Sequence, residues 1–179
     1  MRKLSALLLL VVTVSLSCKK GNSDPNYHLT FTIDGVNKKF NIYAMGFQST
    51  LDGYHGVALG GAESTVANSA TFGLEISNLF NNNNPVVAGT YNDDGTDFEV
   101  LASYQTEAEE SFEAGTTLYQ ETVRTGTAIN NHLKVVITSI GNGSIKGTFS
   151  GDFHLEADPA AAKKVITNGE FYLPLTSTP

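Results

Sequence analysis

Residues 133–155 read LKVVITSIGNGSIKGTFSGDFHL. Two β-type runs flank a Gly-Asn-Gly turn, and apolar and polar residues alternate along both runs. Alternation with a period of two places successive side chains on opposite faces of a sheet. The stretch therefore predicts an antiparallel hairpin with one buried and one solvated face.

The same stretch predicts how the two strands pair. A two-residue loop at Asn142-Gly143 would bring charged side chains onto the apolar face. A three-residue loop over 141–143 instead places Val135 opposite Phe149. Because a slip of one residue moves every side chain to the other face, we expect the three-residue loop, with Gly143 at positive φ.

Similar alternation recurs in short segments along the rest of the chain, each followed by Gly, Asn or Asp. The pattern predicts an all-β fold, an antiparallel β-sandwich or flattened barrel of about ten strands. We expect residues 27–179 to form a single β domain, in which Pro174 marks a sheet edge or the end of a strand. The side chains expected to share its core are Phe72, Leu74, Ile76, Val135, Phe149 and Phe153.

The beginning of the chain predicts an export signal. Met1-Arg2-Lys3 is basic, Leu4 to Leu16 is mostly apolar, and Cys18 is the only cysteine. The apolar run is too short to span a bilayer as a helix, which needs about 20 residues. We expect residues 1–17 to be a lipoprotein signal peptide and Cys18 to carry the lipid. Ser15-Leu16-Ser17 also fits cleavage by an ordinary signal peptidase, which would leave a free thiol.

The composition limits which compartment and which partners are expected. After removal of residues 1–17, 162 of the 179 residues remain, with nine basic residues against 18 acidic ones and a net charge of −9. The chain has no basic patch, so we do not expect it to bind nucleic acid. Residues 18–26 predict a flexible tether, so the membrane contact rests on the lipid at Cys18. Lys19 directly after the cysteine resembles the sorting signals that permit delivery to an outer membrane, so we expect a cell-envelope location at the outer membrane, facing the periplasm or the cell surface.

A polar set of side chains on the hairpin is the first candidate for chemistry. The expected register places His132 opposite Asp152, and Asp152, His154 and Glu156 follow one face of their strand. Such residues could hold a divalent metal, but the pattern is better explained by a solvated sheet face with cross-strand charge pairs. We predict a solvated face and no metal ligands.

Three further groups could carry function. The run from Asp93 to Asp97 is rich in calcium-ligating oxygens, although it fails the EF-hand spacing, and a simple turn explains it as well. A glutamate cluster suggests paired carboxylates, although it is local and expected to be exposed; its members are Glu107, Glu109, Glu110 and Glu113. A set of tyrosines could form a sugar platform or half-buried packing; they are Tyr43, Tyr54, Tyr104 and Tyr119.

Several segments carry a resemblance to a known group of proteins. They are Cys18-Lys19-Lys20, Thr30-Phe31-Thr32-Ile33-Asp34-Gly35, Gly147-Thr148-Phe149-Ser150-Gly151 and Val165-Ile166-Thr167-Asn168-Gly169-Glu170-Phe171. Together they resemble uncharacterised β-rich lipoproteins of the Bacteroidota type, at both ends of the mature chain and little in its middle. The resemblance implies an envelope location and an all-β domain, and it brings no catalytic residues.

These observations lead to one expectation about function and one alternative. We expect a lipid-anchored, non-enzymatic binding or structural module that needs no cofactor and that contacts a glycan or an envelope protein. The alternative is a small-ligand carrier, in which the sheets close around an apolar, lipocalin-like cavity. The sequence does not determine the ligand or the oligomeric state.

Overall fold

The computed structural model describes residues 26–78, 83–117, 119, 131–160 and 162–177. Within these residues eleven strands form one hydrogen-bonded sheet, confirming the predicted all-β class. Their bounds are β1 (His28–Ile33), β2 (Val36–Lys39), β3 (Ile42–Leu51), β4 (Tyr54–Ala62), β5 (Thr71–Asn78), β6 (Gly89–Asn92), β7 (Phe98–Gln105), β8 (Ser111–Gly115), β9 (Lys134–Gly141), β10 (Ser144–Leu155) and β11 (Lys163–Ser177).

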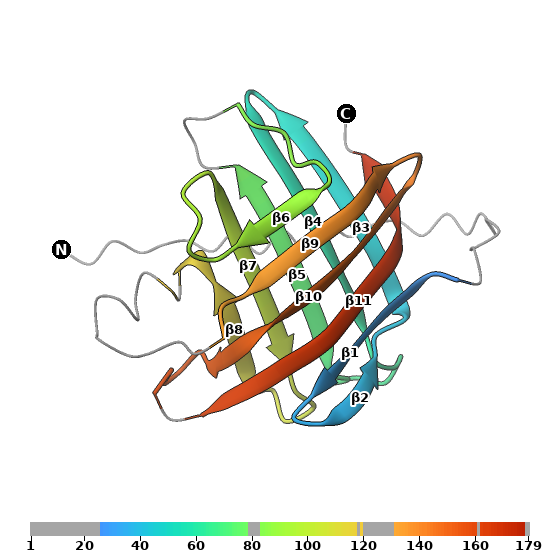
Figure 1. The fold of residues 1–179 in the computed structure, drawn as a ribbon. Coiled ribbons are helices and arrows are strands. Elements are labelled where there is room, and N and C mark those ends of the chain that lie inside the picture. Colours follow the sequence, from blue (N-terminus) through green and yellow to red (C-terminus); the bar gives the residue numbers. More distant parts are fainter. Residues whose placement is uncertain (1–25, 79–82, 118, 120–130, 161, 178–179) are drawn as a thin grey trace.

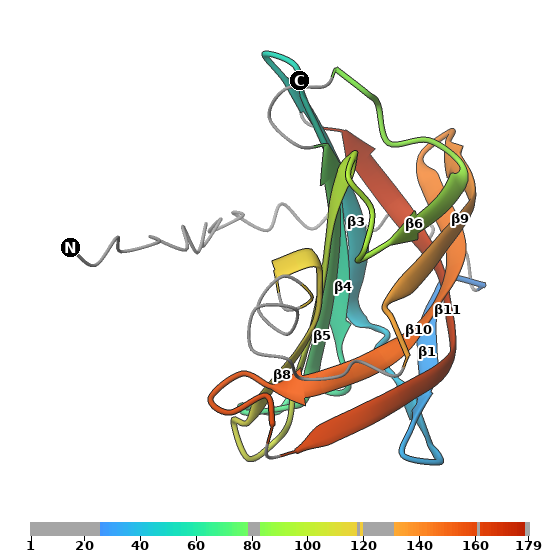
Figure 2. The ribbon, with the colours of Figure 1, turned by 60° about the vertical axis from the view of Figure 1, so that its left-hand side comes forward.

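The sheet folds back on itself into two layers (Figures 1 and 2). A five-stranded layer runs in the order β3-β4-β5-β7-β8, and a six-stranded layer runs in the order β2-β1-β11-β10-β9-β6. The layers join at two corners, where β11 pairs parallel to β3 and β10 pairs antiparallel to β8. Because β10 also pairs with β11, the circuit of strands closes, as expected for a flattened barrel.

The core lies between the two layers, and stacked aromatic rings are part of it. Phe72 stacks on Phe149 with ring centroids 4.8 Å apart, and Phe31 stacks on Phe40 at the same distance. All six side chains predicted to share the core are buried in this one cluster. The predicted alternation along β1 also holds, since Leu29, Phe31 and Ile33 are buried and the threonines between them are not.

The hairpin of β9 and β10 combines both registers that the sequence offered. Near its tip, Gly141 pairs with Ser144 around a two-residue turn in which Asn142 and Gly143 have φ of 52° and 74°. Beyond the bulged residue Thr138, the register shifts so that Val135 faces Phe149. The predicted core pair and the positive φ of Gly143 are therefore confirmed, but the three-residue loop is wrong.

Pro174 does not lie at a sheet edge, contrary to the prediction. It pairs with Ser144 in the interior of the six-stranded layer. The Leu175 N–H donates to the Gly143 carbonyl of β10, so the nitrogen of Pro174 faces the opposite side of β11. On that side the pairing with β1 has ended at Tyr172 and the pairing with β3 begins at Leu175. The missing N–H thus falls at the junction of two ladders, where no partner strand needs it.

Candidate functional site

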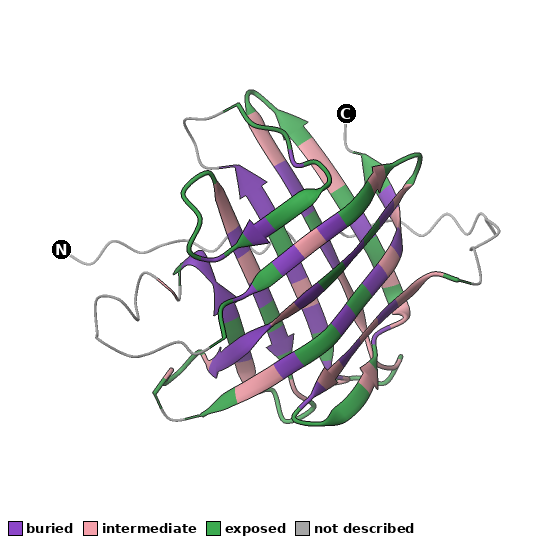
Figure 3. Cartoon of the chain, viewed as in Figure 1, coloured by how far each residue is buried: buried purple, intermediate pink, exposed green. Residues whose placement is uncertain are grey.

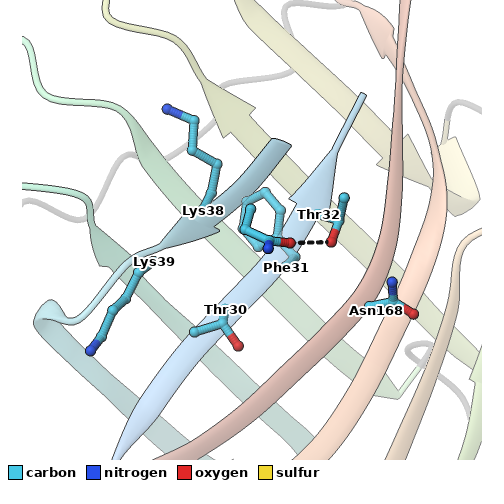
Figure 4. Close-up of a pocket in the computed structure, with 7 residues that line it drawn as sticks. Thr30, Phe31, Thr32, Lys38, Lys39 and Asn168 are labelled. Atoms are coloured by element: carbon cyan, nitrogen blue, oxygen red, sulfur yellow. Dashed lines mark hydrogen bonds between the residues drawn. The ribbon is translucent and has the colours of Figure 1, made fainter. Parts of the chain in front are cut away.

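A polar groove lies on the outer face of the six-stranded layer, over β1, β2 and β11 (Figure 4). Its volume is about 400 Å³. It is lined by Thr30, Phe31, Thr32, Asn37, Lys38, Lys39 and Asn168. Except for the buried ring of Phe31, these are hydroxyl, amide and ammonium side chains. The groove is an open surface feature, separate from the packed core.

Cross-strand pairing sets the lining of the groove. Thr30 pairs with Lys39 and Thr32 with Asn37, so these four side chains share the outer face. The Thr32 hydroxyl donates to the Asn37 amide oxygen at 2.8 Å, the dashed contact in Figure 4. This bond fixes the orientation of the amide and leaves its two N–H donors available at the surface.

A bulge in β11 supplies the far wall of the groove. Asn168 has φ of 52° and pairs with neither neighbour, because both the β1 and the β10 ladders shift register at this point. Asparagine tolerates this left-handed conformation better than most residues. A side chain at the next position, Gly169, would collide with the Phe149 carbonyl and ring. The Asn-Gly pair is therefore a bulge inside a long strand, and its Asn168 is part of the groove lining.

The two adjacent lysines of β2 have different roles. Lys38 donates to both carboxylate oxygens of Glu63 at 3.0 Å, and this bond raises the pKa of the Lys38 ammonium. Lys39 is exposed on the outer face, and no carboxylate of the described residues lies within ion-pair distance. In Figure 4 the two side chains point in different directions. Lys39 thus contributes a positive charge to the groove that no described carboxylate neutralises by an ion pair.

An aromatic cluster lies beside the groove on the same face. The ring of Tyr172 is 4.9 Å from that of Tyr27 and 6.4 Å from that of His28, both in edge-on geometry. His28 pairs with Tyr172 across β1 and β11, and Thr30 pairs with Glu170 in the next row. We call the groove residues together with Tyr27, His28, Tyr172 and Glu170 the β1 strip. In this strip, partly exposed aromatic rings and hydrogen-bonding groups lie about two residues apart along the strand, a distance of about 7 Å.

The residues predicted as a possible metal cluster are not brought together. His132 bonds Asp93 through Nδ1 at 2.9 Å, and the ladder of β9 and β10 ends before it could face Asp152. The Asp152 N–H instead donates to the carbonyl of Asn131. Within the described part of the chain, no group of three or more His, Cys, Asp or Glu residues could hold a metal ion.

The predicted solvated face at the end of β10 is wrong. Asp152 and His154 are both buried. The Asp152 carboxylate accepts hydrogen bonds from Lys163 at 2.8 Å and from Asn131 at 2.9 Å. His154 donates from Nδ1 to the Pro159 carbonyl, since that oxygen can only accept. The alternating pattern predicted that Asp152 and His154 are exposed. It carries no information about the loop after β10, which folds back over this end of the strand.

The acidic run from Asp93 to Asp97 has a structural role at its first residue. Asp93 is 2% exposed, and its two oxygens accept from His132 Nδ1 and from the Leu133 N–H, both at 2.9 Å. The Asp93 N–H in turn donates to the Leu133 carbonyl. This carboxylate thus ties the turn after β6 to the start of β9. Asp94 and Asp97 are exposed in the turn itself.

The glutamates and tyrosines singled out from the sequence are also dispersed. Glu113 lies on β8, while the other three glutamates are in the exposed turn between β7 and β8. Tyr104 is part of the core, whereas Tyr43 is exposed on β3. The Tyr54 hydroxyl donates to Glu75, and the Tyr119 ring lies 5.3 Å from that of His132. These four tyrosines do not form a platform.

The predicted signal peptide over 1–17, the lipidation site at Cys18 and the tether over 18–26 lie outside the described residues, apart from Asn26. No helix in the described part of the chain is long and apolar enough to cross a membrane. Comparisons of the chain with family models, with curated proteins and with solved structures find no match.

Sequence reasoning missed the β1 strip. Tyr27 and Tyr172 lie at opposite ends of the chain, and only the pairing of β1 with β11 brings them together. One signal was available in the sequence. Apolar and polar residues alternate both before and after Asn168-Gly169. An Asn-Gly pair inside one continuous strand pattern indicates a bulge.

Proposed function

We propose that this chain is a lipid-anchored protein of the cell envelope, at the outer membrane, and that it is a non-enzymatic module that binds a glycan through the β1 strip. The single observation that carries the glycan is the juxtaposition of a polar groove with a cluster of aromatic rings on one sheet face. The location and the anchor rest on the sequence of residues 1–18.

The chemistry of the strip matches that of a sugar. A pyranose presents hydroxyls that both donate and accept, and an apolar ring face that packs on aromatic side chains. Asn37, Lys39 and Asn168 supply donors, Thr30 supplies a hydroxyl that can do both, and the tyrosine rings beside them supply the apolar surface. A groove of about 400 Å³ has room for one or two sugar units.

The packing of the interior favours this module over the carrier alternative. A carrier needs an empty apolar space between its sheets, whereas here the rings of Phe31, Phe72 and Phe149 contact one another across the middle of the core. Close-packed rings leave no room for a ligand without displacing several of them. The two described grooves lie on the outer faces of the layers.

A glycan screen tests the proposal. The full chain carrying Cys18→Ala would be screened against envelope and host-type oligosaccharides, and hits would be titrated by calorimetry. We expect Asn37→Ala and Tyr172→Ala to weaken binding about tenfold each, since each removes a contact of hot-spot size. Asn168→Gly keeps the positive φ and removes only the amide, so it should weaken binding without unfolding the bulge.

The matched controls are Ser139→Ala and Lys134→Ala, both exposed on the same layer but on β9. Their affinities should equal that of the parent chain. The glycan proposal fails if no saccharide binds, or if the control variants lose as much affinity as the strip variants.

A further inference from the structure

The other layer has an apolar ridge along its outer face. Met45, Phe47 and Leu51 of β3 are 40%, 41% and 66% exposed, and we call them the β3 ridge. Met45 and Phe47 are two positions apart and Leu51 lies four positions further on, so all three side chains face the same side of the sheet. Figure 3 shows exposed positions recurring along β3. Large apolar side chains exposed together on one strand are unusual on a monomer surface and indicate an interaction site.

Tyr43 is a further exposed aromatic residue of β3, at a strained position. It is 70% exposed and has φ of 54°, within a bulge of the β3–β4 ladder. An aromatic residue in this left-handed region is an outlier that costs free energy. This strained bulge thus leaves the Tyr43 ring exposed on β3.

A trough of small residues runs beside the ridge. Across the layer, Met45 pairs with Gly60, Gly60 with Gly73, and Gly73 with Ser103. In the neighbouring row Phe47 pairs with Ala58. Because these partners have little or no side chain, the ridge stands above them, and a groove of about 400 Å³ lies over β4, β5, β7 and β8.

Among the described residues, the charged side chains of the trough are all acidic. Glu75 and Glu113 line it, and none of the described residues in its lining is Lys, Arg or His. Tyr54 donates to one oxygen of Glu75, whereas Glu113 has no ion-pair partner among the described residues. Partial burial, with a contribution from the nearby Glu156 carboxylate, raises the pKa of Glu113.

From the ridge and the charge together we infer that this face is a docking site for a basic, apolar polypeptide segment of another protein. Apolar side chains of the partner would pack against Phe47 and Met45, and its Lys or Arg side chains would reach Glu75 and Glu113. Complementary charge would align the segment along the trough and exclude acidic partners. A second copy of this chain fits poorly, because it would bring the same carboxylates toward one another.

Peptide binding tests the inference on the full chain carrying Cys18→Ala. The probes are labelled peptides that alternate Lys with Leu, Glu with Leu, and Lys with Ser, so that charge and apolarity vary separately. We expect the Lys-Leu peptide alone to bind tightly and its affinity to fall with salt. Phe47→Ser and the pair Glu75→Gln, Glu113→Gln should each weaken it about tenfold.

Matched controls separate this face from general attraction to an acidic protein. The pair Glu109→Gln, Glu110→Gln removes the same charge from an exposed turn, and Val66→Ser removes another exposed apolar residue. Both should bind like the parent, and all variants should keep its melting temperature. Equal losses in controls and face variants would overturn the inference. So would equal binding of the Glu-Leu peptide, or self-association of the free protein that Phe47→Ser abolishes.

Discussion

Asp93 shows how one carboxylate can determine local structure. It is buried in the turn after β6, and both of its oxygens are engaged by the segment that begins β9. Without it, the Leu133 N–H would be buried with no acceptor. An unsatisfied buried donor costs more than the bond itself contributes.

We predict that Asp93→Ala lowers the free energy of unfolding by roughly 2–3 kcal/mol, the sum expected for a lost charged hydrogen bond and an orphaned donor. Asp93→Asn should cost less, because its amide oxygen can still accept from Leu133. Urea denaturation monitored by fluorescence measures both. Asp94→Ala, on the exposed neighbour, is the control, and a loss for Asp93→Ala no larger than for this control would contradict the assigned role.

Asp152 is expected to make the stability of the fold depend on pH in the acidic range. Burial raises the pKa of this carboxylate, but hydrogen bonds from Lys163 and Asn131, with the charge of Lys163, outweigh burial and lower the pKa overall. A lowered pKa in the folded state contributes stability above the unfolded value of about 3.9, and that contribution disappears as the pH falls through the folded value.

We therefore predict that the parent chain loses stability as the pH falls below about 4, and that Asp152→Asn flattens this part of the profile. The same variant should be less stable than the parent at neutral pH, because Lys163 then lacks its carboxylate. Thermal unfolding at a series of pH values measures both effects. If the two profiles stayed parallel over the acidic range, the ion pair would not be the source of the acid sensitivity.

At the scale of elements, the hairpin of β9 and β10 shows how far the sequence predicts pairing. Apolar matching correctly predicted that Val135 faces Phe149, because a slip there would bury polar side chains. The tip carries no such constraint, so the preference of Asn-Gly for a two-residue turn decides its geometry. The bulge at Thr138 reconciles the two registers, and its hydroxyl donates to the Lys146 carbonyl.

The candidate sites were harder to predict for a related reason. The polar residues of a short strand show no periodic pattern that predicts which other strand pairs with it. The β1 strip requires the pairing of β1 with β11, between residues more than 130 positions apart. The buried roles of Asp93 and Asp152 depend likewise on partners in distant turns. Alternation predicts which face a side chain occupies but not what covers that face.

Core packing on β10 gives a prediction for the element itself. Phe149 stacks on Phe72 and lies 5.7 Å from the Phe31 ring, while its neighbour Thr148 faces solvent. Phe149→Ala should lower the free energy of unfolding by about 3–5 kcal/mol, through lost burial and the cavity left behind. Thr148→Ala should change it by less than about 0.5 kcal/mol. Chemical denaturation measures both, and similar effects of the two substitutions would remove Phe149 from the core.

For the whole molecule, the strands form a closed circuit that does not involve the predicted lipid anchor. The first strand begins at His28, and its partners are β11 and β2, so no described pairing involves the predicted tether. Lys19 to Asn26 are eight residues that can reach at most about 29 Å when extended. A lipid at Cys18 would thus hold the β1 strip and the β3 ridge within a few tens of ångströms of the membrane.

We predict that Cys18→Ala moves the protein from the membrane fraction to the soluble fraction and abolishes acyl labelling. The melting temperature should not change, because the core is built from residues that follow the tether. Fractionation, labelling with a fatty-acid analogue and thermal unfolding measure the three effects. Lys19→Ala is the control, since it alters the neighbouring residue but keeps the thiol that accepts the lipid. Membrane association that survived Cys18→Ala would show that another part of the chain binds the membrane, and an equal release by Lys19→Ala would point to processing of the signal instead of the lipid itself.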